Sequence, residues 1–265
     1  MTSTSAAAPD RVVRGTSGSG LLLAHGATGS VEGNYAPLLN GLAERYRMVG
    51  ADYPGSGRSP VADGPLELDA LADRLVAVAV EEGLETFAVS GYSLGGAVAV
   101  RAAVRHPERV TALVLTAAFA RPSARMGVLV DDWLRHLRSD DPEAAARWMV
   151  LQAAGAPFLD RMTRAELAAV IDGTRTSVPP GAADQVELVG RVDIRADLER
   201  ITVPTLVIST AVDAMVTPYH HRQLADGIPG ARYAEIPSGH LPFVEAPDAW
   251  LELTGAFLDE NATAR

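Results

Sequence analysis

The serine at position 93 has the surroundings of an activated nucleophile. A strand-length apolar run, residues 87–89, precedes it, and a helix-length run of small apolar residues follows it as far as Arg105. Between them, Gly91 and Gly95 remove the Cβ atoms that would clash in a very tight strand-to-helix turn. Such a turn lifts the Ser93 hydroxyl clear of the sheet, at the N-terminus of a helix whose free N–H groups favour negative charge. Ser93 is therefore the candidate nucleophile.

A serine hydroxyl needs a base, and the base needs an acid that orients it. Both residue types follow predicted strands in this sequence. Asp213 comes shortly after the strand 205–209, and His240 comes shortly after the strand 233–236. Open α/β sheets place their sites at the carboxyl ends of their strands, so we expect these two side chains to meet Ser93 there. The chain order serine, aspartate, histidine is one of the known orders of a catalytic triad.

Other residues compete for the roles of acid and base. Asp52 also ends a predicted strand, but the Pro-Gly-Ser-Gly sequence after it favours a structured loop, so it is the weaker candidate for the acid. Residues 117–119, after a further strand, offer no acid. Of the six histidines, His25 and His240 follow strands in glycine-containing loops. The others are expected at a helix end or within helices, in solvated or packing roles: His106, His136, His220 and His221.

The negative oxygen that develops during acyl transfer needs two fixed N–H donors. The backbone N–H of Leu94, directly after the nucleophile, is one predicted donor. The segment His25-Gly26-Ala27 follows the first strand, and the backbone N–H of Ala27 is the other. Taken alone, His25-Gly26 is typical of an ordinary tight turn. Beside the Ser93 turn, it predicts an oxyanion hole.

Composition limits the class of protein. The 265 residues suit one α/β domain with an insertion, or at most two small domains, and the hydrophobic share of 48% provides a substantial core. No apolar stretch approaches the roughly 18 residues that span a membrane, and no secretory signal is visible, so we expect a cytoplasmic protein. The absence of cysteine excludes disulfides, a thiolate nucleophile and cysteine-based metal sites. The net charge of −10 argues against nucleic acid as a partner.

Known cofactor and metal motifs are absent from the sequence. There is no His-Glu-x-x-His, and no G-x-G-x-x-G follows a predicted strand. Gly55-Ser56-Gly57 lacks the lysine of a phosphate-binding loop. We therefore expect neither a cofactor nor a metal ion.

Strands and helices alternate over most of the chain, which predicts a mostly parallel sheet with helices on both faces. Residues 120–200 break this alternation and contain helical runs without a convincing strand. The run 163–171 opens with Thr163-x-x-Glu166, the pattern of a capping box. We expect an α/β core formed by residues 1–119 and 201–265, with residues 120–200 inserted as a helical cap over the carboxyl edge of the sheet.

The expected elements follow from the periodicity of apolar residues. The predicted strands are 21–24, 48–51, 87–89, 112–116, 205–209 and 233–236, with at most a short edge strand at Val12-Val13. The predicted helices outside the insertion are 35–46, 68–82, 97–105, 218–226 and 247–258. Those within it are 128–137, 142–153 and 163–171.

Six short motifs in this order resemble those of the cap-bearing, single-domain enzymes of the α/β-hydrolase superfamily, from about residue 20 to the end of the chain. They are His25-Gly26-Ala27, Asp52-x-x-Gly55-x-Gly57-x-Ser59, Gly91-Tyr92-Ser93-Leu94-Gly95-Gly96, His106-Pro107-x-Arg109-Val110, Asp213-x-x-Val216 and Gly239-His240-x-x-x-x-Glu245-x-Pro247. Two features depart from the family pattern. Thr210 stands where a glycine often lies three residues before the acid, and the short stretch before Leu21 predicts a sheet that is short on that edge.

The resemblance implies hydrolysis of an ester, lactone, thioester or carbon–carbon bond, or cofactor-free perhydrolysis as in some members. A serine at position 93 argues against the aspartate-dependent dehalogenases and epoxide hydrolases of this fold. The leading hypothesis is a serine hydrolase that acts on a small, mainly apolar acyl substrate. A carrier-linked thioesterase and a receptor-like binding protein with vestigial turnover stay open as alternatives, as do a carrier protein or a second copy of the chain as partners.

The insertion contains residues that could select the substrate. Its aromatic residues are expected to roof Ser93, and they belong either to the core of the cap or to the pocket: Trp133, Trp148 and Phe158. Its arginines could recognise a carboxylate, but a solvated basic face is the stronger interpretation: Arg121, Arg125, Arg135 and Arg138.

Overall fold

A seven-stranded sheet forms the centre of the molecule in the computed structural model, which describes residues 11–261. Its strand order is β1-β3-β2-β4-β5-β6-β7, and all neighbouring strands are parallel except β1, which pairs antiparallel with β3. The predicted mostly parallel α/β fold is confirmed. The strands are β1 Arg11–Arg14, β2 Ser19–Ala24, β3 Tyr46–Ala51, β4 Phe87–Tyr92, β5 Val110–Thr116, β6 Thr205–Thr210 and β7 Arg232–Ile236.

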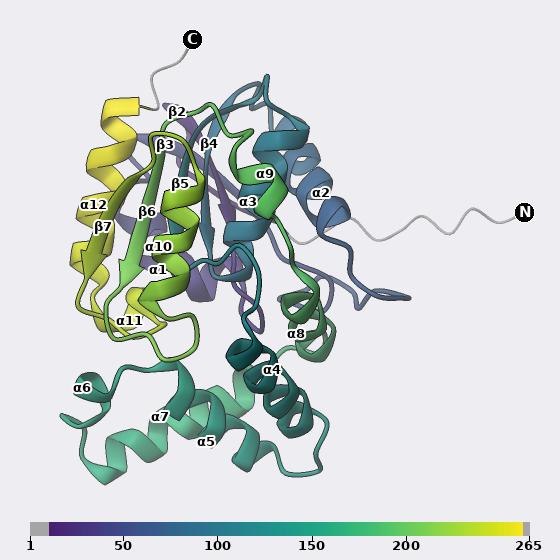
Figure 1. The fold of residues 1–265 in the computed structure, drawn as a ribbon, viewed down its shortest axis with the longest axis vertical. Helices are drawn as coiled ribbons and strands as arrows, with labels where there is room; N and C mark the ends of the chain where they lie inside the picture. The colour runs from purple at the N-terminus through teal and green to yellow at the C-terminus, as the bar shows by residue number, and fades with distance from the viewer. Residues whose placement is uncertain (1–10, 262–265) are drawn as a thin grey trace, which may run out of the picture.

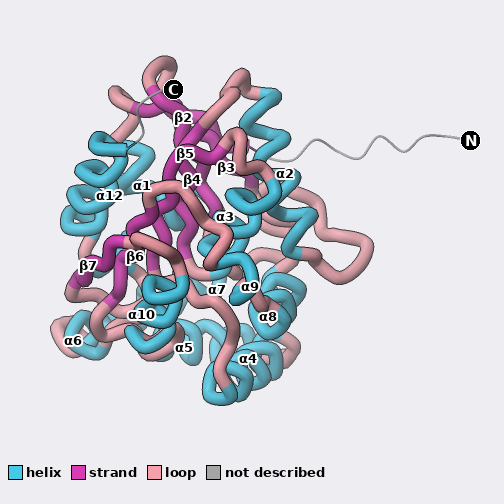
Figure 2. Tube along the Cα trace, turned by 45° about the horizontal axis from the view of Figure 1, so that its top comes forward, coloured by secondary structure: helices cyan, strands magenta, loops and turns pink. Residues whose placement is uncertain are grey.

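Helices cover both faces of this sheet (Figures 1 and 2). Because successive side chains of a strand point to opposite faces, Leu22 belongs to one apolar cluster and Leu21 and Leu23 belong to another. The first cluster lies beneath helices α2 (Leu68–Glu81) and α3 (Leu94–Arg105). The second lies beneath α1 (Val31–Gly41) and α12 (Pro247–Asn261). Burial on both faces explains why the central strands are continuous apolar runs.

Helices α4 to α8 follow β5 and gather at one end of the molecule, at the lower end of Figure 1. Their bounds are α4 Ala124–Leu137, α5 Pro142–Ala153, α6 Ala156–Leu159, α7 Arg164–Ser177 and α8 Ala182–Arg191. The chain returns to the sheet through α9 (Arg195–Leu198), and α10 (Pro218–Gly227) and α11 (Pro242–Glu245) follow β6 and β7. The division of the chain into a core and a cap domain stays a prediction.

Several boundaries differ from those expected. Helix α1 begins at Val31 because the Ser30 hydroxyl accepts the Gly33 N–H at 3.1 Å and caps it. The Thr163–Glu166 capping box is confirmed, but α7 continues to Ser177. Helix α8 follows the Pro179-Pro180-Gly181 segment and was not among the helices expected within the insertion.

The edge of the sheet next to β3 is also resolved. Residues 11–14 form the short edge strand expected at Val12-Val13, so the sheet is extended there by one antiparallel strand. Residues 1–10, which precede this strand, lie outside the described part of the chain.

Candidate active site

Ser93 lies on a strained turn between β4 and α3. Its backbone has φ of 54° and ψ of −119°, values that a residue with a side chain rarely adopts. A Cβ on Gly91 would lie 2.3 Å from the Gly95 carbonyl oxygen, and one on Gly95 would lie 1.9 Å from that of Ala24. Both glycines are therefore required by the close approach of backbones, as the sequence predicted. The turn leaves Ser93 at the end of β4, next to the cavity described below.

A continuous chain of hydrogen bonds joins Ser93, His240 and Asp213. The Ser93 Oγ lies 2.9 Å from His240 Nε2, and His240 Nδ1 lies 2.7 Å from Asp213 Oδ2. All three side chains are buried. The geometry fits a protonated Nδ1 that donates to Asp213, which leaves Nε2 free to accept the serine proton.

The Asp213 carboxylate is held by four donors. Besides His240, its Oδ2 accepts the Thr210 hydroxyl at 2.9 Å, and its Oδ1 accepts the backbone N–H groups of Met215 and Val216 at 2.9 and 3.0 Å. The departure from the family pattern at Thr210 thus supplies an additional donor to the acid. The sequence did not reveal this role, because only the folded loop brings the two side chains together.

Asp52 occupies a different place. Its Oδ1 accepts the Val31 N–H at the start of α1 at 2.7 Å, and it lies 3.7 Å from His25 Nε2. The carboxylate hydrogen-bonded to His240 is that of Asp213. The geometry therefore favours Asp213 over Asp52 as the acid.

The loop after β2 lies against the nucleophile. A Cβ on Gly26 would come within 2.6 Å of the Tyr92 ring and 3.3 Å of the Ser93 Cβ. His25 is fully buried beneath this loop, where its Nδ1 donates to the Gly26 carbonyl at 2.7 Å and its Nε2 accepts the Tyr53 N–H at 2.9 Å. Burial lowers the pKa of His25 to about 4, so its ring stays neutral and supports the loop.

The two predicted oxyanion donors are not paired with backbone carbonyls in the described part of the chain. Among residues 11–261, neither the Ala27 N–H nor the Leu94 N–H donates to a backbone carbonyl. Ala27 and Ser93 line the same cavity. The two N–H groups are thus available to an oxygen of a bound molecule.

A further histidine is buried beside the acid. His221 on α10 is fully buried, its Nδ1 lies 3.0 Å from the Ser209 hydroxyl, and its Nε2 lies 4.0 Å from Asp213 Oδ2. Burial lowers the pKa of His221 to about 4. His220 and His221 on α10 are thus both buried, while His106 pairs with Asp73 at 2.8 Å.

Because His25 and His221 are buried in the neutral form, we expect the folded protein to lose stability in mild acid. The unfolded chain binds protons on His25 and His221 near pH 6.5, whereas the folded protein keeps both neutral down to about pH 4. The free energy of unfolding should therefore be fully present above pH 6.5 and decrease as the pH falls from 6.5 towards 4. Urea unfolding at pH 8, 6, 5 and 4.5 measures this. His221→Asn should flatten the slope, and a constant stability across that range would contradict the expectation.

The histidine loop is joined to the helical insertion. The His240 backbone N–H donates to the Ala153 carbonyl at the end of α5, at 2.7 Å. The Glu245 carboxylate accepts the N–H of Gly155 at 3.1 Å, of Gly239 at 2.7 Å and of Leu241 at 3.3 Å. The sequence motif contained Glu245 without indicating a role, and the structure shows that it joins two segments 90 residues apart.

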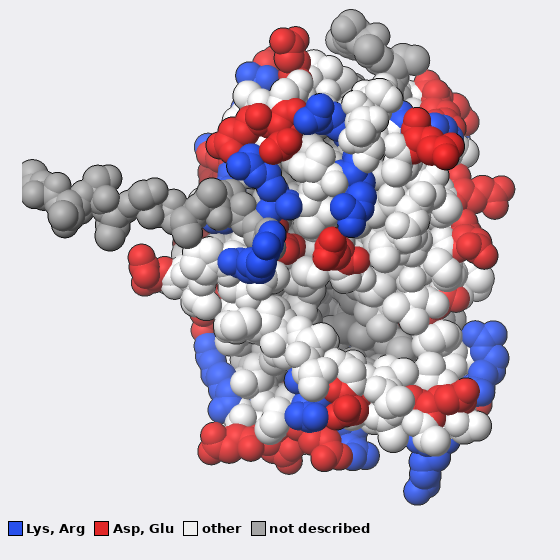
Figure 3. Space-filling view, turned by 180° about the vertical axis from the view of Figure 1, so that it is seen from behind, with Lys and Arg blue, Asp and Glu red and all other residues white. Residues whose placement is uncertain are grey.

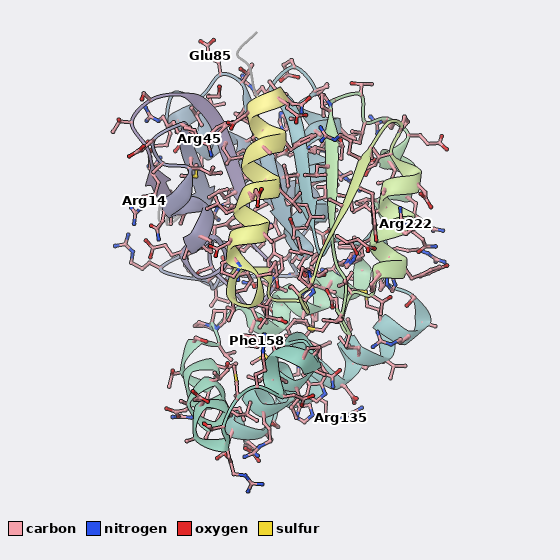
Figure 4. All side chains as sticks on the ribbon, turned by 90° about the vertical axis from the view of Figure 1, so that its left-hand side faces the viewer. Arg14, Arg45, Glu85, Arg135, Phe158 and Arg222 are labelled. Atoms are coloured by element: carbon pink, nitrogen blue, oxygen red, sulfur yellow. The ribbon has the colours of Figure 1, made fainter. Side chains whose placement is uncertain are left out.

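A cavity of about 310 Å³ opens onto Ser93 between the insertion and the sheet. Its described lining holds no charged residue and consists mainly of apolar side chains, among them Trp133, Met149, Phe158 and Phe243. Figure 4 places Phe158 where the two parts of the molecule meet. In Figure 3, the surface is hollowed between these parts, and mainly uncharged residues border the hollow. The described lining therefore offers no Asp, Glu, Lys or Arg side chain to pair with a charged group.

The arginines of the insertion lie elsewhere. Arg125 donates to the Ala214 carbonyl, Arg135 pairs with Asp132, and Arg138 pairs with Glu187. Arg121 is exposed, and none of the four lines the cavity. The structure favours the interpretation of these residues as a solvated face.

Within residues 11–261, no three His, Asp or Glu side chains are grouped so as to bind a metal ion. In the same range, no helix combines the length and the apolar character needed to cross a bilayer.

Comparison with known proteins identifies the family. The family model for the alpha/beta hydrolase fold matches residues 21–247. The chain is 31% identical over 243 residues to pyrrolizixenacetamide deacetylase of Xenorhabdus hominickii, with 91% of each chain covered. It is 32% identical to the pimeloyl-(acyl-carrier protein) methyl ester esterase of Edwardsiella ictaluri, over 82% of this chain and 85% of that one. The crystal structure of the enol-lactonase from Burkholderia xenovorans LB400 superposes with a TM-score of 0.83 at 26% identity, over 94% of this chain and 96% of that one. The chain therefore belongs to the alpha/beta hydrolase family.

Proposed function

We propose that this protein is a serine hydrolase that cleaves an ester or related acyl bond of a small, mainly apolar substrate. The observation that carries the proposal is the hydrogen-bond chain from Ser93 through His240 to Asp213, beside an uncharged cavity of about 310 Å³. The relatives support the class of reaction, because they include a deacetylase, a methyl ester esterase and an enol-lactonase.

The reaction begins when the Ser93 Oγ attacks the carbonyl carbon of the substrate. Its proton passes to Nε2 of His240, and the carbonyl oxygen becomes an oxyanion that accepts hydrogen bonds from the N–H groups of Ala27 and Leu94. Collapse of this intermediate breaks the bond to the leaving group, which takes the proton from His240. The product of this half-reaction is an acyl-enzyme on Ser93.

Water completes the cycle by the same route. His240 removes a proton from water, the hydroxide attacks the acyl carbon, and the Ser93 oxygen leaves with the proton from His240. Asp213 fixes the imidazole tautomer and stabilises the imidazolium that forms twice per cycle. Its four donors, the Thr210 hydroxyl among them, hold the carboxylate in the orientation that this role needs.

We also propose that residues 120–200 act as a cap that selects the acyl group. Side chains from α4, α5 and α7 contribute to the cavity wall, and the cavity carries no charge on its described lining. Excluding water at this point strengthens the hydrogen bonds to the oxyanion. A neutral, apolar acyl group suits such a wall, because a charged one would lose its hydration without gaining a partner.

The three aromatic residues of the insertion should separate into two groups. Trp133 and Phe158 line the cavity. Trp148 packs beside Trp133, with its ring centroid 6.0 Å from that of Trp133 and 5.5 Å from that of His136. Replacing Trp133 or Phe158 with alanine should widen the cavity and shift the preference among p-nitrophenyl esters towards longer acyl chains, by about tenfold in relative kcat/KM. Trp148→Ala is the matched control and should lower the melting temperature while leaving the order of preference unchanged. Equal chain-length profiles for all the variants would contradict the proposed role of the cap.

Esters of carrier-bound acyl groups are a second candidate substrate class. This is favoured by the esterase relative, whose name specifies an acyl group on an acyl-carrier protein. Comparing kcat/KM for one acyl ester presented free and on a carrier protein tests it. A preference of more than about tenfold for the carrier-bound form would support a carrier partner, and equal values would favour the small-molecule substrate.

Turnover of p-nitrophenyl esters from acetate to octanoate tests the proposed function as a whole. We expect release of p-nitrophenolate in proportion to enzyme, abolished by a fluorophosphonate that reacts with activated serines. A folded protein that hydrolyses none of these esters, nor a lactone or thioester of similar size, would favour a binding protein.

A further inference from the structure

The oxyanion loop adopts a conformation that needs support. Thr28, directly after the proposed donor Ala27, is a non-glycine residue with φ of 60°. Such a conformation is strained and persists only where surrounding contacts fix it. The Thr28 N–H lies in the peptide plane that adjoins, at the Ala27 Cα, the plane carrying the Ala27 N–H. Holding the first plane therefore restricts the orientation of the second.

The contact that fixes Thr28 comes from the helical insertion. The Oε1 atom of Gln185, on α8, accepts the Thr28 N–H at 2.8 Å across 157 residues of sequence. Its Nε2 donates to the Pro54 carbonyl at 3.2 Å and to the Ser56 hydroxyl at 2.8 Å. The side chain of Gln185 is fully buried.

These partners require an amide at position 185. The Thr28 N–H can only donate and the Pro54 carbonyl can only accept, so the orientation of the amide is unambiguous. A carboxylate would meet the Pro54 oxygen with a second oxygen, and an apolar side chain would leave buried polar groups without partners. Gln185 therefore joins the oxyanion loop to the loop of residues 54–56.

A close contact between backbones brings α8 to this position. The Gly181 N–H donates to the Gly55 carbonyl at 3.2 Å, and a Cβ on Gly181 would lie 2.3 Å from the Pro54 oxygen. Gly55 has φ of 77°, and a Cβ there would lie 2.4 Å from Gly181. Gln185 follows Gly181 by one helical turn and so reaches Thr28.

We infer that Gln185 is a positioning residue for the oxyanion hole: through Thr28 it holds the Ala27 N–H towards the substrate carbonyl oxygen. This inference rests on the proposed function and deepens it. It makes α8 of the insertion part of the machinery that supports the transition state, in addition to any role as a roof.

A thionoester probe distinguishes a residue that positions the oxyanion hole from one that only attaches the insertion to the α/β core. Sulfur accepts hydrogen bonds weakly, so a working oxyanion hole favours a p-nitrophenyl ester strongly over the matching thionoester. We expect Gln185→Met, which keeps the length of the side chain, to lower kcat for the ester by about 10- to 100-fold with KM within about twofold. The ratio of ester to thionoester rates should fall by about tenfold, and Gln185→Ala should behave alike. Leu188→Ala, at a buried position of the same helix, should lower the melting temperature and keep the wild-type ratio.

The possible outcomes are distinct. If wild type turns over neither ester, nor a lactone or thioester of similar size, the proposed function fails. If wild type prefers the ester and folded Gln185→Met retains that preference, Gln185 only attaches the insertion to the loops after β2 and β3. The inference is then wrong. Failure of both Gln185 variants to fold, while Leu188→Ala folds, would also overturn it, because the residue would then be needed for folding.

Discussion

Ser93→Ala should lower kcat/KM for a p-nitrophenyl ester by about 10⁵- to 10⁶-fold while leaving the protein folded. The expected loss is this large because the Ser93 hydroxyl, 2.9 Å from His240 Nε2, is the group proposed to form the acyl-enzyme. Hydrolysis by the variant should still be faster than the uncatalysed reaction, since the N–H donors and the cavity remain.

Ser90→Ala is the matched control for this substitution. Ser90 is a buried serine on β4, the strand that leads to the Ser93 turn, and its hydroxyl has no hydrogen-bond partner within residues 11–261. Its removal should leave the rate within about threefold of wild type. Steady-state kinetics of both variants, with circular dichroism to check folding, measure the difference. A near-wild-type rate for Ser93→Ala would refute the assignment of the nucleophile.

Asp213→Asn should lower the rate by about 10⁴-fold. An amide at this position can present its N–H₂ group to His240 Nδ1, which favours the tautomer with the proton on Nε2, and that nitrogen can no longer accept the serine proton. The remaining contacts from Met215 and Val216 should keep the loop folded.

Asp52→Asn serves as the comparison for the acid. An asparagine there can still accept the Val31 N–H that Asp52 accepts at 2.7 Å, so we expect less than a tenfold loss of rate. Rates measured for the two variants under the same conditions decide between them. The reverse ranking would assign the acid to the loop after β3.

Local motifs explain why the proximity of Ser93, Asp213 and His240 was predictable from the sequence. Ser93, Asp213 and His240 each lie just beyond a strand, and parallel strands bring their carboxyl ends to one edge. Glycines at 91 and 95 marked the tight turn independently of any long-range contact. The sheet itself followed from alternating strands and helices.

Contacts between distant segments were not predictable. Gln185 and Thr28 are 157 residues apart, and nothing in the sequence around either one indicates the other. The same holds for Glu245 and Gly155, which only the packing of the insertion brings together. Trp133 lines the cavity and Trp148 does not. This difference also depends on tertiary packing, because both residues lie in predicted helices of the insertion.

The most direct test of the central claim is the site at which a fluorophosphonate labels the protein. Tandem mass spectrometry of the labelled and digested chain locates the adduct. We predict one adduct per chain, on Ser93, formed by wild type and by Ser90→Ala but absent from Ser93→Ala. Labelling of another residue, or an equal yield in folded Ser93→Ala, would contradict the account of Ser93 as the nucleophile of a serine hydrolase.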